Sequence, residues 1–330
     1  MKRIFTLYFF ALFCLISQAQ EELYERVYVH TDKTCYLAGE EVWIKFYTTD
    51  THFQPSFFSK VGYVEISNAE RPQAQLKLAL DNGSGSGKIK IPADAPSGIY
   101  ELSGYTQYMR NEGEKIFFRK QIAIINTFRI AESDPITLAD STETYPKEVP
   151  AMNGNIRINT SRPSYSMRQP VELTINGLPE EVSDLIVSVS RNDSLVILPH
   201  HEESVWRQQV TSTPGTFSGQ WVPEYEGHII RGQIQTPEGE TLKQIQNKHV
   251  SADIAFVGKD IRYVQGQVDV EGNARFYTSN IFGINDIVAA AWGANGESYQ
   301  MNILSPFCEN LPKNLPQLKL YRNKKRLLER

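Results

Sequence analysis

Runs of residues in which apolar and polar side chains alternate recur along most of the chain, and such runs form β-strands with one buried face. Between Val42 and Tyr47, for example, the residues at even positions are apolar, whereas Trp43 and Lys45 would point to the opposite face. Turn-rich clusters separate these runs, and helical periodicity is hardly visible beyond the N-terminal segment. We therefore predict an all-β chain whose antiparallel sheets pack face to face as sandwiches. Further candidate strands lie at 27–30, 61–66, 75–80, 88–91, 99–106 and 115–125.

An internal repeat narrows this prediction to tandem domains. Residues 27–47 align with residues 156–176 at a shift of 129 positions, which is the separation between Thr31 and Thr160. The same shift pairs Lys33 with Arg162, Tyr36 with Tyr165, Val42 with Val171, Ile44 with Leu173 and Phe46 with Ile175. A repeat of this length indicates a duplicated domain, because solenoid units run about 20 to 50 residues. The alternative is that two unrelated strands share only their alternation.

The N-terminus has the three parts of a cleavable secretory signal peptide. Lys2 and Arg3 form a basic head, residues 4–16 are almost entirely apolar, and a small-x-small exit ends at Ala19. We predict cleavage between Ala19 and Gln20. A membrane anchor is the alternative, but it needs about 20 apolar residues. Lipidation is a second alternative, and it needs a small residue before the cysteine, where this chain has a phenylalanine.

Cleavage would change both the charge and the cysteine content of the chain. The formal charge would go from -4 to -6, and an acidic chain without clustered cations argues against nucleic-acid binding. No later apolar run is long enough to cross a bilayer, so we predict no transmembrane helix in the mature chain. Cys35 and Cys308 would remain, in different predicted modules. The sequence leaves open whether they pair, and stability is expected to come from apolar burial.

Composition divides the mature chain into modules. Residues 131–152 are rich in Asp, Glu, Ser, Thr and Pro, which predicts an acidic linker. A new set of strands begins at His228, and three prolines after residue 301 predict an irregular tail. The apolar, basic ending at Arg330 suggests that a further domain follows. The predicted layout is a signal peptide at 1–19, sandwiches at 20–130, 153–226 and 227–300, the linker at 131–152 and the tail at 301–330.

Part of the first module resembles the second macroglobulin-like domain of the α2-macroglobulin family. The resemblance is carried by Thr31, Asp32, Lys33, Tyr36, Gly39, Val42 and Trp43, and by a closing hairpin with Pro96, Gly98 and Tyr100. It covers most of residues 24–128 and implies a macroglobulin-like sandwich with these residues in structural roles. The second copy keeps the Thr and Tyr but has Arg168 in place of Gly39.

The third module resembles the regulatory, transthyretin-like sandwich of carboxypeptidases. The shared residues are Gly232, Ile234, Asp269, Gly272 and Phe276, and Gly272 is expected in a hairpin turn that needs a positive φ angle. With the signal peptide, this combination resembles exported proteins of Gram-negative bacteria, in the periplasm or at the cell surface. The resemblance to protease-trapping macroglobulins is incomplete. Neither Cys35 nor Cys308 stands in the Cys-Gly-Glu-Gln sequence of the thioester.

Motifs for catalysis and cofactor binding do not fit. The cluster His200-His201-Glu202-Glu203 lacks the helical spacing of zinc ligands, so we predict no metal site. The glycine-rich stretch 81–88 lacks the first Gly and the final Ser or Thr of a phosphate loop, and it contains no nucleophile elbow. A flexible hairpin is expected there. A pair of carboxylates that meets only in space stays open as a route to an enzyme.

The sequence therefore predicts a protein that is not an enzyme and binds no cofactor. Its expected function is that of a structural or protein-binding module in an envelope or cell-surface assembly, with envelope or surface proteins as partners. Proteases or glycans are the alternative partners. The corresponding alternative functions are a macroglobulin-like endopeptidase inhibitor, or a fragment of one, and a carbohydrate-binding accessory protein that stacks sugars on exposed aromatic side chains.

Overall fold

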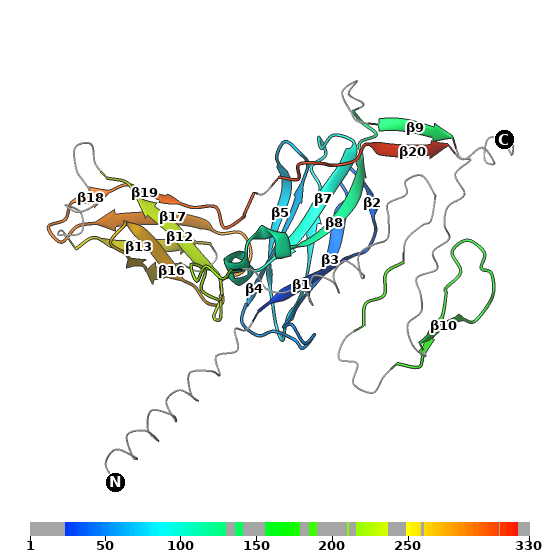
Figure 1. Cartoon of the computed structure of the whole chain (residues 1–330), viewed down its shortest axis with the longest axis horizontal. Coiled ribbons are helices and arrows are strands. Elements are labelled where there is room, and N and C mark those ends of the chain that lie inside the picture. The colour runs from blue at the N-terminus through cyan, green and yellow to red at the C-terminus, as the bar shows by residue number, and fades with distance from the viewer. Residues whose placement is uncertain are drawn as a thin grey trace, which may run out of the picture. The chain divides into compact units, whose positions relative to one another are not determined.

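A computed structural model of the chain describes residues 24–129, 136–140, 156–178, 185–189, 210, 216–236, 249–258, 261–309 and 311–322. The chain divides into two units, one formed by Met1–Ile136 and Leu198–Leu318 and the other by Thr137–Ile197 and Lys319–Arg330. The first unit contains two β-sandwiches, which Figure 1 shows in blue to green and in yellow to orange. The predicted all-β fold of tandem sandwiches is confirmed. The predicted signal peptide, including Ala19 and Gln20, lies outside the described residues.

The first sandwich packs a three-stranded sheet, β1-β3-β6, on a five-stranded sheet, β2-β8-β7-β4-β5. Its strands are β1 (Arg26–Thr31), β2 (Cys35–Leu37), β3 (Glu41–Thr49), β4 (Val61–Ser67), β5 (Pro72–Ala79), β6 (Ser84–Lys90), β7 (Gly98–Tyr105) and β8 (Phe118–Ile125). Two short 3-10 helices, η1 (Tyr108–Glu112) and η2 (Glu114–Ile116), connect β7 to β8. The pairing is antiparallel except between β2 and β8, which run parallel.

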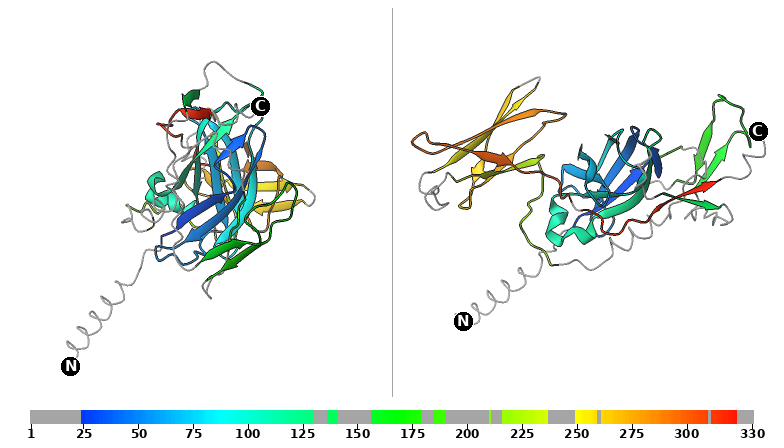
Figure 2. Two further views of the ribbon diagram at one scale, coloured as in Figure 1. Left: turned by 90° about the vertical axis from the view of Figure 1, so that its right-hand side faces the viewer. Right: turned by 90° about the horizontal axis from the view of Figure 1, so that it is seen from above.

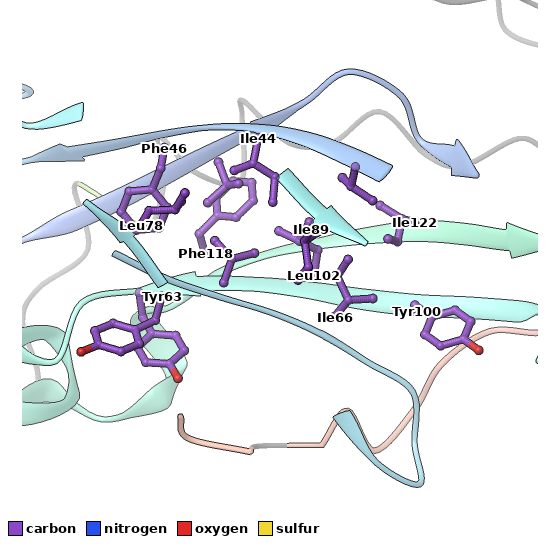
Figure 3. Packing of buried hydrophobic residues seen from close by; sticks show 14 of the residues in the cluster. Ile44, Phe46, Tyr63, Ile66, Leu78, Ile89, Tyr100, Leu102, Phe118 and Ile122 are labelled. Carbon is purple, nitrogen blue, oxygen red and sulfur yellow. The ribbon is translucent and has the colours of Figure 1, made fainter. Parts of the chain in front are cut away.

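The core of the first sandwich follows the alternation of the sequence. Val42, Ile44 and Phe46 are at most 3% exposed, while Trp43 on the opposite face of β3 is 59% exposed. Figure 3 shows Ile44 and Phe46 of β3 on the side that faces Ile66 of β4 and Leu102 of β7, in the core between the two sheets. Strand β4 departs from the pattern, because all seven of its residues are buried. Its outer face must therefore be covered by something other than the sandwich itself.

The third predicted module is also a β-sandwich, with sheets β15-β16-β12-β19 and β14-β13-β17-β18. Its strands are β12 (Ile229–Ile234), β13 (Ser251–Val257), β14 (Arg262–Gln265), β15 (Gln267–Val268), β16 (Asn273–Tyr277), β17 (Asp286–Trp292), β18 (Ser298–Tyr299) and β19 (Met301–Ile303). A separate core includes Ile254 and Phe276. Gly272 has a φ of 80° between β15 and β16, so its predicted role in a hairpin turn is confirmed.

The second unit has two strand pairs among its described residues. One pair joins β10 (Arg157–Thr160) and β11 (Leu173–Asn176), and the other joins β9 (Ile136–Asp140) and β20 (Leu318–Arg322). The prediction of an irregular tail from residue 301 is wrong at β19 and β20. The linker predicted at 131–152 likewise contains β9. The three prolines that suggested irregularity, Pro306, Pro312 and Pro316, all lie between β19 and β20, where they remove no ladder hydrogen bond.

The repeat found in the sequence extends to backbone register and hydrogen bonding. β1 pairs with β3 so that Thr31 lies opposite Ile44, and β10 pairs with β11 so that Thr160 lies opposite Leu173, each shifted by 129. In both copies the threonine hydroxyl donates to the carbonyl two residues on, at 2.7 Å. In both, a tyrosine hydroxyl accepts from a backbone N–H three residues before it, at 3.1 and 3.0 Å.

One position of the repeat predicts a stabilising substitution. Gly39 has a φ of 88°, and Arg168 at the equivalent position has a φ of 64°, a conformation that costs a side-chain-bearing residue free energy. We expect Arg168→Gly to stabilise the β10–β11 hairpin by up to about 1 kcal/mol, partly offset by the greater freedom of glycine when unfolded. Amide hydrogen exchange of β10 and β11 would measure it. Gly39→Arg should have the opposite sign, and a loss of protection in Arg168→Gly would contradict the expectation.

Candidate binding surface

The first motif residues identified in the sequence form a hydrogen-bonded turn between β1 and β3. The Asp32 carboxylate accepts hydrogen bonds from the Tyr36 hydroxyl at 2.8 Å and from the Trp43 backbone N–H at 3.0 Å. Lys33 forms an ion pair with Glu40 at 2.9 Å. Burial, followed by the hydrogen bond and charge of Asp32, raises the pKa of Tyr36 far above its usual value. The turn is held by mutual contacts of its own side chains, with Thr31 included through its bond to the Lys33 carbonyl.

The remaining motif residues take equally structural places. Val42 is fully buried in the core, and Gly39 supplies the left-handed turn residue before β3. In the closing hairpin, the Tyr100 hydroxyl donates to the Pro96 carbonyl at 2.6 Å, and Gly98 begins β7. The structure thus brings Thr31 to Trp43 together in one turn, and β8 lies between this turn and the hairpin, since Ile124 pairs with both Tyr36 and Gly98.

The sequence candidates for chemistry do not assemble into a reactive site in the described residues. The hairpin expected in the glycine-rich stretch is wrong, because β5 and β6 belong to different sheets. Residues 81–83 form the turn that connects the two sheets, with positive φ angles at Asn82 and Gly83, and residues 84–88 belong to β6. The cluster at 200–203 lies outside the described residues. Within the part of the chain that the structure describes, no three His, Cys, Asp or Glu side chains gather as metal ligands. A helix long and apolar enough to span a bilayer is also absent from that part.

A buried carboxylate of the segment before β12 covers the outer face of β4. Glu224 is 1% exposed and accepts hydrogen bonds from the Tyr63 hydroxyl at 2.9 Å and from the Ile229 backbone N–H at 2.8 Å. The His228 imidazole Nδ1 lies 3.0 Å from the same carboxylate and 2.9 Å from the Tyr63 oxygen. Burial, followed by the charge of Glu224, raises the pKa of Tyr63 well above its usual value. We call this set the Glu224 clamp.

A second buried carboxylate, that of Glu65, lies two residues after Tyr63 on β4 and holds the segment after β19. Glu65 accepts from the Tyr105 hydroxyl at 2.5 Å and from the Cys308 backbone N–H at 3.0 Å. We call this set the Glu65 clamp. Burial raises the pKa of the Cys308 thiol to about 11, so the thiol stays protonated at neutral pH. Neither Cys35 nor Cys308 forms a disulfide bond. The two clamps explain why β4 is buried on both faces.

Trp221 adds an aromatic contact between the clamped segment and both sandwiches. Its ring lies between the guanidinium groups of Arg110 and Arg231, whose carbon atoms are 3.5 and 3.7 Å from the ring centroid. The Asn111 side chain donates to the Trp221 carbonyl at 2.7 Å and accepts from its N–H at 2.9 Å. Burial, then the charges of Arg275 and Arg110, lowers the pKa of Arg231 to about 10. The negative face of the indole ring offsets part of this repulsion.

A third buried carboxylate, Glu25, makes a pH-dependent contribution to the first sandwich. It accepts hydrogen bonds at 2.7 Å from the hydroxyls of Ser56, Ser59 and Thr106. Burial raises its pKa, and these hydrogen bonds offset only part of that rise. A raised carboxyl pKa favours folding most below the unfolded pKa, and the contribution is lost as the pH rises through the folded pKa.

Glu25→Gln should therefore remove part of the loss of stability at higher pH. We expect the unfolding free energy of this variant, relative to wild type, to increase as the pH rises above about 4, where a carboxyl group of ordinary pKa ionises. Denaturant unfolding at several pH values would measure the difference. Glu70→Gln makes the same chemical change on an exposed side chain and should show no such trend. A constant difference between Glu25→Gln and wild type would contradict the assignment.

An exposed apolar sheet face stands out on the sandwich that the clamps hold. On the side of β14-β13-β17 away from the core, Tyr263 lies opposite Ala255, which lies opposite Val288. Tyr263 is 64% and Val288 59% exposed, and Trp292 on the same face is 38% exposed. Asp253, 3% exposed, lies between them on β13. We call this surface, which also includes Val257, Gln265, Ala290 and the exposed Asp286, the β13 face.

No protein-family model matches the sequence, and no curated protein matches it. The native alpha-2-macroglobulin of Escherichia coli is similar over 87% of this chain and 14% of its own, with 8% identity and a TM-score of 0.27. Salmonella alpha-2-macroglobulin reacted with methylamine is similar over 84% of this chain and 23% of its own, with 9% identity and a TM-score of 0.27.

A bacteriophage protein gives a comparable overlap. Three N-terminal domains of the RB49 outer capsid protein Hoc are similar over 84% of this chain and 66% of their own, with 7% identity and a TM-score of 0.20. This chain spans only 14% to 23% of the macroglobulins named above. We draw nothing from these overlaps about activity or partners. Membership of the motif turn in the macroglobulin family and of the third sandwich in the carboxypeptidase-regulatory family both stay predictions.

Sequence reasoning missed the residues that connect the two sandwiches. Glu224 and Glu65 stand in ordinary surroundings in the sequence, and their partners are 161 and 243 residues away. One signal was available in β4. The face of β4 that alternation assigns to solvent carries Tyr63 and Glu65, and both residues are buried. Trp221 lies within the second module predicted at 153–226, and it instead contacts η1 and β12.

Proposed function

We propose that this chain is a non-catalytic, exported protein-binding module of an envelope or cell-surface assembly, and that the β13 face contacts the partner protein. The observation that carries the proposal is the exposure of Tyr263, Val288 and Trp292 on one continuous sheet face. Soluble monomers rarely expose such contiguous apolar patches, and aromatic side chains are enriched where proteins associate. The two small alanines between these side chains leave room for a partner's side chains.

The clamps support the same function because they order the presenting sandwich in advance. Both chain segments that enter and leave it are fixed on β4, through Glu224 and through Glu65. A surface that is already ordered loses less conformational entropy on binding, which leaves more of the contact energy for affinity. Export is supported by the signal-like N-terminus, and Edman sequencing of the mature protein from the periplasmic fraction should begin at Gln20.

The binding proposal is tested by crosslinking in the native cell followed by mass spectrometry. Val288→Asp places a charge in the β13 face, and Val270→Asp places one on the hairpin of the other sheet, where Val270 is 66% exposed. We expect wild type and Val270→Asp to capture the same envelope protein and Val288→Asp to lose it by tenfold or more, about 1.4 kcal/mol. Equal capture by all three proteins, each with an unchanged melting temperature, would sink the proposal.

The alternative function from the sequence, an endopeptidase inhibitor or a fragment of one, has a separate test. The mature protein is incubated with a panel of proteases, and cleavage of a large protein substrate is compared with cleavage of a short peptide. Inhibition by steric trapping would slow only the large substrate. Unchanged rates on both substrates across the panel would exclude this role for the chain.

A further inference from the structure

The outer face of the β1-β3-β6 sheet carries a second exposed surface that the proposed function leaves unused. Trp43, Lys45 and Tyr47 alternate with core residues along β3, so all three project from this face. Trp43 is 59% exposed, and a residue spacing of about 3.3 Å places Tyr47 roughly 13 Å from it along the strand. The two rings are therefore far enough apart to pack on different units of one extended ligand.

Strand β6 completes this surface with lysines and with short side chains. Lys88 lies opposite Trp43 in the register, and its Nζ is 5.8 Å from the centroid of that ring. Lys90 follows on the same face and is exposed. Ser84 lies opposite Tyr47, so no bulky β6 side chain rises beside that tyrosine. We call the set Trp43, Lys45, Tyr47, Ser84, Ser86, Lys88 and Lys90 the lysine-aromatic strip.

The strip is positively charged on a chain whose formal charge is -4. Glu41 forms an ion pair with Lys88 at 2.9 Å and is the acidic side chain on β3 itself. Lys45 donates to the Ser84 hydroxyl at 3.2 Å, and its Nζ lies 5.3 Å from the centroid of the Tyr47 ring. Lys45, Lys88 and Lys90 thus flank the aromatic rings, against Glu41 and the Asp32 carboxylate, which accepts from the Trp43 backbone N–H at 3.0 Å. The excess of one lysine favours an anionic ligand at the strip.

The position of the strip distinguishes between classes of anionic polymer. β3 is the central strand of its sheet and pairs with β1 and β6 on either side, so its backbone groups are already used. A polypeptide that adds a strand would have to pair along the edge strand β6, and not over the central strand β3 that carries Trp43 and Tyr47. The C–H groups of a sugar ring, in contrast, pack on the negative face of an aromatic ring without backbone contacts. Ring stacking and lysine pairing together match a charged sugar chain.

We propose that the lysine-aromatic strip binds an acidic polysaccharide, with Trp43 and Tyr47 stacked on sugar rings and Lys45, Lys88 and Lys90 paired with its carboxylates. This inference is independent of the β13 face and goes beyond the proposed function. The side chains of the strip project away from the core of the first sandwich, so we expect substitutions in the strip to leave the fold intact.

The test is titration calorimetry of the mature chain with polygalacturonate. Its methyl ester is the uncharged control ligand, and polyglutamate and a single-stranded oligonucleotide are the other anionic ligands. We expect Trp43→Ala to weaken polygalacturonate binding by about tenfold and Lys88→Ala by several-fold. Phe57→Ala is the matched control, since Phe57 is 60% exposed on the same sandwich outside the strip. Binding should also weaken as salt is raised.

Each result decides for or against the strip. Binding of polygalacturonate that weakens with Trp43→Ala, with methyl esterification and with salt, but not with Phe57→Ala, supports it. Equal binding of the methyl ester would show that the lysines do not select charge and would overturn the proposal. It is also overturned if polyglutamate or the oligonucleotide binds as tightly, if Trp43→Ala binds like wild type with an unchanged melting temperature, or if polygalacturonate does not bind.

Discussion

Glu224→Ala is expected to lower the unfolding free energy of the first unit by about 3 kcal/mol, because it leaves the Ile229 N–H buried without an acceptor and removes the carboxylate that the Tyr63 hydroxyl donates to. For a unit of this size, that loss corresponds to a fall in melting temperature of roughly 6 °C or more. Differential scanning calorimetry would measure it. We also expect faster proteolysis between residues 216 and 228, because the clamp holds that segment on β4.

Glu226→Ala is the matched control for this experiment. Glu226 is exposed and lies two residues along the same segment, so the same change should alter stability by less than about 0.5 kcal/mol. If Glu224→Ala and Glu226→Ala melted together and were cleaved at the same rate, the Glu224 clamp would not hold the segment. A lower melting temperature without faster cleavage would place the effect in the first sandwich alone.

Trp221→Ala should give the second large effect, a loss of about 3 kcal/mol. The substitution removes an indole ring packed between Arg110 and Arg231 and brings the two cations together without the ring. Unfolding in urea would measure the change, and raising the salt concentration should recover part of it, because screening weakens the repulsion between the arginines.

Trp43→Ala is the comparison for this prediction. The ring of Trp43 is exposed and contacts a lysine at 5.8 Å, so its loss should cost less than about 1 kcal/mol. Equal destabilisation by the two substitutions would mean that Trp221 acts only as one more apolar side chain. Salt recovery confined to Trp221→Ala would identify the arginine repulsion as the cause.

The sequence predicted the parts of the fold that depend on neighbouring residues. Alternation in β3 identified Val42 and Phe46 as core and Trp43 as exposed, because side-chain direction along a strand has a fixed period. The repeat predicted the equivalent turns at Tyr36 and Tyr165, because each turn is closed by side chains within four residues. Gly272 was predictable for the same reason.

Contacts between distant segments could not be predicted in this way. Nothing near Glu65 or Glu224 in the sequence indicates which donors they meet, since those donors come from other strands and segments. β20 was missed because its partner, β9, is far away in the chain and lies in a stretch whose composition predicted a linker. The candidate surfaces were also only partly predictable. Alternation shows that Val288 and Trp43 can be exposed, but not what packs beside them.

The distance in sequence between β4 and its covering segments has a consequence for synthesis. Tyr63 and Glu65 lie 161 and 243 residues before Glu224 and Cys308, while N-terminal domains fold as units once they emerge. The nascent first sandwich therefore displays Tyr63, Glu65 and Tyr105 to water until the later segments arrive. The later segments pack on that face, and the Glu65 clamp forms only once residue 308 is present. A chain truncated before residue 308 would therefore hold a folded first sandwich without the Glu65 clamp.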